Sequence, residues 1–171
     1  PACPGGMGAT QAWNRDAILA ERGGFDCSKA HPAMGNYHHH QNPSAFDLDL
    51  VVLSTICTLY DADGLYAINS SIHSPLIGFA YDGFPIYGAY SYQNANGTGP
   101  IVRIKSSYSL NSGTTRTLGP NVSTTYPLGY FREDYHYTAT SAGTPDYLDE
   151  HNGRFCVTPE YPSGIYCYFA T

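Results

Sequence analysis

Turn-forming residues divide most of this chain into short segments, and this feature limits the possible fold more than any other. Gly, Pro and aromatic residues alternate at short intervals through residues 72–92, and a similar pattern runs from residue 126 to the end. Such spacing favours short strands joined by tight turns. Loops rich in Gly, Asn and Thr at residues 94–100 and 111–121 flank a further predicted strand at Ile101–Ile104. The sequence therefore predicts a β-rich fold of short strands and long loops.

A few longer patterns complete this picture. Residues Gln11–Arg22 form the one convincing helix candidate, with Thr10 available as its cap. Residues Asp47–Leu59 alternate in polarity and then run apolar, which predicts a buried strand. The segments Phe155–Val157 and Ile165–Phe169 are predicted to pair as a terminal hairpin. We expect a mainly β protein with one or two short helices.

The length of the chain suits a single compact domain covering residues 1–171. A chain of this size can bury roughly 70% of the surface that its unfolded state exposes. No segment approaches the roughly 18 apolar residues that a membrane helix needs. The first residues, Pro1–Pro4, resemble neither an initiator methionine nor a signal peptide, so we expect this domain to be a segment of a longer secreted protein.

Charge and composition exclude one large class of partner. The 8 basic residues are outnumbered by 14 acidic ones, which gives a net charge of −6, and no basic cluster occurs anywhere. A nucleic-acid partner is therefore not expected. The 16 tyrosines offer apolar area with a polar tip, as is common in secreted β-rich proteins and at interfaces.

Five scattered cysteines predict disulfides rather than a thiolate zinc site, because no CxxC pair is present. We expect Cys156 and Cys167 to be oxidised, either to each other across the terminal hairpin or with one of them bonded to Cys57. Cys3 and Cys27 are the natural remaining pair. The odd number leaves one cysteine over.

Several features point outside the cytosol. The chain has few lysines, several cysteines and three sequons, whose asparagines are Asn69, Asn96 and Asn121. These asparagines are candidate sites for N-glycans in an extracellular protein. We therefore expect a secreted or cell-surface location.

Three adjacent histidines, between turn formers, give the strongest chemical signal. If this segment is extended, His38 and His40 project from one face while Tyr37 and His39 project from the other. Two imidazoles on one face are half of a site for zinc, copper, nickel or iron. The alternative is a solvated turn that binds metal only as a purification tag does.

Other candidate ligands lie elsewhere in the sequence. His73 and Asp82 bracket an apolar segment that can turn back after Gly78. Either side chain can act as a ligand, or Asp82 can be a carboxylate that orients a ligating imidazole. The alternative is that Asp82 only stabilises a turn. His31, directly before Pro32, is a weaker candidate. Asp61 and Asp63 have the spacing of calcium ligands, but the acid that completes a calcium loop is missing.

Three blocks of the sequence resemble one family. Gly35–His40, His73–Gly88 and Leu148–Phe155 together resemble the YHYH domain family of predicted secreted or surface proteins, named for a Tyr-His-Tyr-His motif. Tyr37 and both outer histidines match this motif, whereas His39 replaces its second tyrosine. The resemblance implies an extracellular domain with a metal site, and it supplies no reaction.

The last of these blocks adds one more candidate ligand. Asp149–Gly153 resembles an acidic Asn-Gly block in which many members of the family carry Cys where His151 stands. Because a thiol and an imidazole both bind soft metals, the resemblance makes His151 a candidate ligand.

The sequence supports three functional hypotheses. The first is a secreted domain that binds one transition metal, copper in preference to zinc, with His38 and His40 as core ligands and with His73, His151 or Asp82 completing the site. The second is a structural or adhesive glycosylated surface module that self-assembles, for example as a filament subunit. The third is a metal-dependent extracellular enzyme in which residues 79–92 line a cleft.

Overall fold

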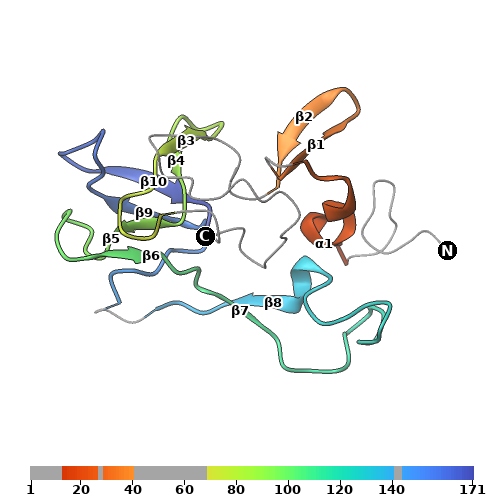
Figure 1. Ribbon diagram of the computed structural model, residues 1–171. Coiled ribbons are helices and arrows are strands. Elements are labelled where there is room, and N and C mark those ends of the chain that lie inside the picture. The colour runs from red at the N-terminus through yellow and green to blue at the C-terminus, as the bar shows by residue number, and fades with distance from the viewer. Residues whose placement is uncertain (1–12, 27–28, 41–68, 141–143) are drawn as a thin grey trace. The chain divides into compact units, whose positions relative to one another are not determined.

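The computed structural model describes residues 13–26, 29–40, 69–140 and 144–171. Contacts divide the chain into two compact units, one formed by residues 1–23 and 108–138 and the other by residues 24–107 and 139–171. The described residues form ten short strands in small sheets and one short α-helix, which confirms the β-rich prediction (Figure 1). None of the described helices is long and apolar enough to cross a membrane. The expectation of a single domain over residues 1–171 stays a prediction.

Some predictions fall on residues outside the described ranges. These are the strand at Asp47–Leu59, the turn at Asp61–Gly64, and the cysteines Cys3, Cys27 and Cys57.

The largest sheet belongs to the second unit and has the strand order β3-β4-β10-β9. Strands β3 (Leu76–Phe79) and β4 (Pro85–Tyr87) form one antiparallel hairpin. Strands β9 (Gly153–Cys156) and β10 (Ile165–Phe169) form a second, drawn in blue in Figure 1, which confirms the predicted terminal hairpin. Parallel pairing of β10 with β4 joins the two hairpins. Segments far apart in the sequence thus meet in one sheet.

One face of this sheet carries the core of the second unit. Its fully or nearly fully buried members are Tyr87, Ile104, Leu148, Cys156, Cys167 and Phe169. A small antiparallel sheet of β5 (Tyr90–Tyr92) and β6 (Ile101–Arg103) adds the partly buried Val102. The strand predicted at Ile101–Ile104 is thereby confirmed.

A buried arginine links the loops around this core. The Arg154 guanidinium donates hydrogen bonds to the backbone carbonyls of Tyr92, Gln93 and Pro145. It also lies over the ring of Phe169, with the guanidinium carbon 5.4 Å from the ring centroid. Because an arginine carries five donors in a rigid fork, one side chain can tie several loops together.

The two buried cysteines correct one prediction. Cys156 and Cys167 point to the same face of the terminal hairpin, but their Sγ atoms lie 3.3 Å apart and both are thiols. A disulfide needs an S–S distance of about 2.05 Å. The predicted bond is not formed in this structure, in which the two residues are diagonal neighbours: Cys156 pairs with Ile165, and Cys167 pairs with Arg154.

The first unit contains α1 (Ala17–Glu21), the antiparallel pair β7 (Tyr108–Leu110) and β8 (Tyr135–Tyr137), and the short 3-10 helix η2 (Arg132–Asp134). A second 3-10 turn, η1 (Arg22–Gly24), follows α1.

The helix is shorter than the sequence predicts, beginning at Ala17 and ending at Glu21. Residues 14–16 are extended instead, because the N–H of Asp16 donates to Tyr130 and the carbonyl of Asn14 accepts from Arg132. The Asp16 carboxylate then caps the helix by accepting a hydrogen bond from the N–H of Ile18 at 2.8 Å. Strand-like pairing thus prevails over helix propensity here.

Candidate metal centre

The hairpin of β1 (Ala30–Ala33) and β2 (Asn36–His39), drawn in orange in Figure 1, positions the candidate ligands. Its loop has only two residues, Met34 and Gly35, and both have positive φ angles, of 50° and 85°. Two central residues with positive φ give the turn type that matches the natural twist of a two-stranded ribbon. This tight turn fixes the register of the hairpin.

That register brings three histidines together. His31 pairs directly with His38 across the two strands, so both rings lie on one face. His40 follows two residues later on the same face, and its N–H donates to the carbonyl of Lys29 at 2.9 Å, which extends the ladder. The sequence alternation predicted that His38 and His40 project together, and the hairpin places them so.

The three imidazoles converge closely. One ring nitrogen from each of His31, His38 and His40 lies within 4.8 Å of the others. The Nε2 atoms of His31 and His40 are only 3.1 Å apart. Two nitrogens bound to one tetrahedral zinc ion would be separated by about 3.3 Å, as Zn–N bonds of about 2.0–2.1 Å require. This cluster can hold a metal ion.

A backbone contact leaves one of these rings ready to bind. The Nδ1 atom of His38 lies 3.2 Å from the carbonyl oxygen of Asn36. Since a carbonyl only accepts, Nδ1 is the donor in this contact, which leaves Nε2 as the nitrogen that can bind a metal. Metal-binding histidines commonly use such a hydrogen bond to fix the tautomer and the ring orientation.

Neighbouring side chains hold the hairpin in place. The ring of the buried Phe25 stacks on His40, with centroids 4.8 Å apart and planes at 13°. On the opposite face the rings of Tyr37 and His39 meet edge to face at 5.5 Å, and the Tyr37 hydroxyl donates to Asp26. His39 is exposed, whereas the three clustered histidines are half-buried. The cluster is thus supported from one side and reachable from solvent.

His73, a predicted ligand, lies among other partners. Its Nδ1 donates to the carbonyl of Ser74 at 2.7 Å, so its Nε2 must accept from the hydroxyl of Ser91 at 3.0 Å. Its ring packs on Tyr87 and Tyr92. Burial lowers the pKa of His73, although the hydrogen bond to Ser74 opposes this shift. Both nitrogens of this neutral ring are therefore in use.

The structure also places Asp82 and His151 apart from the histidine cluster. Among the described residues, neither belongs to the group of converging ligand atoms. The Asp82 carboxylate accepts hydrogen bonds from the Tyr168 hydroxyl and from the N–H of Phe84. His151 is exposed, and its Nε2 lies 4.0 Å from the carboxylate of Glu150.

His31 is the ligand candidate that the sequence ranks too low. The Pro32 beside it disfavours a central strand, but a proline is tolerated in a two-stranded ribbon, where each strand has a free edge. The signal that could have found it is the Met34-Gly35 turn. With a two-residue loop at these positions, residue 31 must face residue 38.

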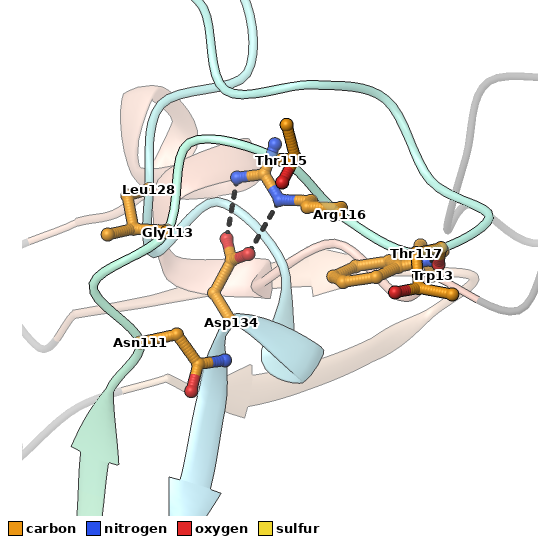
Figure 2. A pocket seen from close by; sticks show the side chains of 8 residues that line it. All are labelled: Trp13, Asn111, Gly113, Thr115, Arg116, Thr117, Leu128 and Asp134. Carbon is orange, nitrogen blue, oxygen red and sulfur yellow. Dashed lines mark hydrogen bonds and ion pairs between the residues drawn. The ribbon is translucent and has the colours of Figure 1, made fainter.

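A second concave site lies in the first unit (Figure 2). Its volume of about 230 Å³ is below the roughly 300–1,000 Å³ of typical ligand pockets. Arg116 and Asp134 in its wall form a bidentate pair, and the three remaining Arg116 donors bind backbone carbonyls, which are those of Pro120, Tyr126 and Pro127. With all five donors in use, this arginine stabilises loops and is not available for an anionic ligand.

Comparison with known proteins agrees with the resemblance seen in the sequence blocks. The model of the family described as YHYH protein matches residues 3–171, nearly the whole chain. No curated protein and no solved structure matches the chain. Taken with the histidine-bearing block and the two further blocks, this match means that the chain belongs to the YHYH protein family.

Proposed function

We propose that this chain is a secreted or cell-surface domain that binds one transition metal ion through His31, His38 and His40. The observation that carries the proposal is the convergence of three imidazole nitrogens within 4.8 Å on a hairpin whose register is fixed by a two-residue turn. A tag-like solvated tract has no such fixed geometry. The proposal differs from a site built on His73, Asp82 or His151, because those side chains have partners of their own.

The three imidazole nitrogens suit a transition metal of intermediate softness. Neutral imidazole is a good ligand for zinc, copper, iron and nickel, and copper(II) heads the affinity order of divalent ions. Copper is therefore favoured over zinc, more so if the domain works outside the cell, where copper stays oxidised. Three imidazoles leave a fourth position, which another side chain or water would fill.

The direct test is the metal content of the untagged protein. The chain is loaded separately with copper and zinc, dialysed, and analysed for metal per polypeptide. We expect about one equivalent, as for a single protein site. A protein that keeps less than about a tenth of an equivalent of either metal lacks a site of the expected affinity.

Exposed aromatic side chains support a second candidate, a structural or adhesive module. Tyr81 is fully exposed, and Phe79 and Phe155 are 58% and 64% exposed. Apolar side chains of this kind favour contacts between molecules. Size measurement over a range of protein concentrations, with and without chelator, separates the two candidates. A monomer at every concentration excludes self-assembly through this chain, whereas assembly that persists in chelator favours the structural module.

A further inference from the structure

The sheet β3-β4-β10-β9 has a second, solvent-facing side, here called the outer face. Tyr166 and Tyr168 point to it from β10, Phe155 from β9 and Ile86 from β4, because paired residues and residues two apart share one face of a sheet. Phe84, just before β4, lies with its ring centroid 5.3 Å from that of Tyr166. All five side chains are at least partly exposed. The outer face is therefore apolar and largely aromatic.

The rings on this face stand at steep angles to one another. The planes of Tyr166 and Tyr168 are perpendicular at 90°, and those of Phe84 and Tyr166 meet at 70°. Gly153 makes this arrangement possible, because a Cβ atom there would collide with the hydroxyl of Tyr166. The rings therefore form angled walls rather than one flat surface.

Two carboxylates border these rings. The Tyr166 hydroxyl donates to Asp149 at 2.7 Å, and the Tyr168 hydroxyl donates to Asp82. The hydrogen bond from Tyr168, helped by the N–H of Phe84, lowers the pKa of Asp82. Burial alone would raise the pKa of Asp149, but the hydrogen bonds from Tyr166 and from nearby backbone N–H groups lower it. Both carboxylates are therefore ionised at neutral pH.

Little positive charge is described near these two carboxylates, and the smallest cause of the lowered pKa of Asp149 is its interaction with His151. The four strands place no lysine or arginine on the outer face, since their one basic residue, Arg154, points into the core from the opposite side. Aromatic ring faces attract cations through the ring quadrupole, and a phenol that donates to a carboxylate has a more electron-rich ring. Angled aromatic walls beside carboxylates are the usual surroundings of a bound ammonium or guanidinium group.

We propose that the outer face binds a lysine- or arginine-bearing segment of another protein. The apolar rings contact the long aliphatic stem of such a side chain, while its charge lies against the ring faces and near Asp82 and Asp149. A second copy of this chain is a poor source of such a basic segment, because it has only 8 basic residues and a net charge of −6. The proposal is independent of the metal site.

Titration of the isotope-labelled full chain with a short peptide of alternating lysine and serine tests this inference by NMR. A peptide with glutamate in place of lysine serves as the charge control. We expect shift changes at the outer-face residues with the lysine peptide alone, and unchanged binding after chelation. Phe155→Ala should weaken this binding about two- to fivefold, the factor that corresponds to an exposed cation–π contact. Asp82→Asn should weaken it further and reduce its dependence on salt.

Leu118→Ala is the matched control, since Leu118 is 92% exposed in the first unit. This variant should bind like the unmodified chain. Equal binding by the Phe155→Ala variant and the control would overturn the proposal, as would equal binding of both peptides. Aromatic surfaces can also bind carbohydrates, so cellohexaose, a neutral oligosaccharide, serves as the probe for this alternative. Shifts at the same residues with this sugar, and none with the lysine peptide, would also contradict the inference.

Discussion

The Nε2 atoms of His31 and His40 lie 3.1 Å apart, although the two residues are nine positions apart in the sequence. At this distance one ring nitrogen can donate a hydrogen bond to the other, which holds the two rings together. A metal ion between them would replace this hydrogen bond with two coordinate bonds. The cluster is therefore arranged in the metal-free chain before any ion binds, and its arrangement depends on the hairpin turn.

The turn itself can be tested by substitution. Met34 has a left-handed backbone, which costs about 1–2 kcal/mol for an ordinary residue and less for asparagine. Met34→Asn should therefore stabilise the hairpin by about 0.5–1 kcal/mol. Hydrogen exchange of the His40 N–H, which closes the hairpin ladder, reports on this directly and should become slower.

Gly35→Ala should have the opposite effect. Gly35 has a φ angle of 85°, where a Cβ atom adds strain of about 1 kcal/mol. The His40 N–H should exchange faster in this variant, and zinc affinity should fall with the hairpin population. If Gly35→Ala leaves both quantities unchanged, the hairpin does not control the metal site.

The Arg116–Asp134 pair should be the main electrostatic support of the first unit. Both side chains are 2% exposed, and the Asp134 carboxylate also accepts hydrogen bonds from the N–H groups of Gly129 and Phe131. Asp134→Asn leaves the Arg116 charge buried without its partner, which should cost about 3–5 kcal/mol. Urea unfolding at pH 7 measures this loss, and a change below about 1 kcal/mol would mean that the pair is not buried in solution.

The same pair predicts a loss of stability in acid. Burial alone would raise the pKa of Asp134, but hydrogen bonds from Arg116 and from backbone N–H groups lower it overall. With a folded-state pKa below the unfolded value of about 3.9, the carboxylate contributes its full stabilisation above that pH. The contribution disappears as the pH falls through the folded-state pKa. The free energy of unfolding should decline less steeply below pH 4 in the Asp134→Asn variant than in the unmodified chain.

Oxidation should convert the two buried thiols into a bond within the hairpin. The Sγ atoms of Cys156 and Cys167 are 3.3 Å apart, so a small rotation of the side chains brings them to bonding distance. Peptide mapping without reductant, after exposure to a mild oxidant, should find these two cysteines linked to each other. Two free thiols, or a bond from either to Cys57, would contradict this pairing.

Predictions from the sequence were correct where the structure depends on residues that are close together in the chain. The terminal hairpin followed from two apolar runs around a Pro- and Gly-containing loop, and the shared face of His38 and His40 followed from strand alternation. The predictions were wrong where the structure depends on pairing between residues that are far apart in the chain. The helix begins later than predicted, because the backbone groups of Asn14 and Asp16 form hydrogen bonds with residues more than 100 positions away.

The candidate site shows the same limit. His73 looked available because its partner Ser91 lies eighteen residues further along the chain and joins it only through the fold. His31 looked weak because its neighbour is a proline, whereas its pairing with His38 depends on the exact loop length. Side chains far apart in sequence could not be assigned to one site from periodicity alone.

The most direct test of the metal site is the affinity of four single variants for copper and zinc, measured by competition with a chromophoric chelator. His31→Ala, His38→Ala and His40→Ala each remove an imidazole from the cluster, so each should weaken binding more than the roughly 10- to 100-fold typical of residues that only orient a ligand. His39→Ala, the matched control on the opposite face, should change the affinity little. Small losses of affinity of similar size at all four positions would contradict the account. This is the behaviour expected of a solvated histidine tract without a defined site.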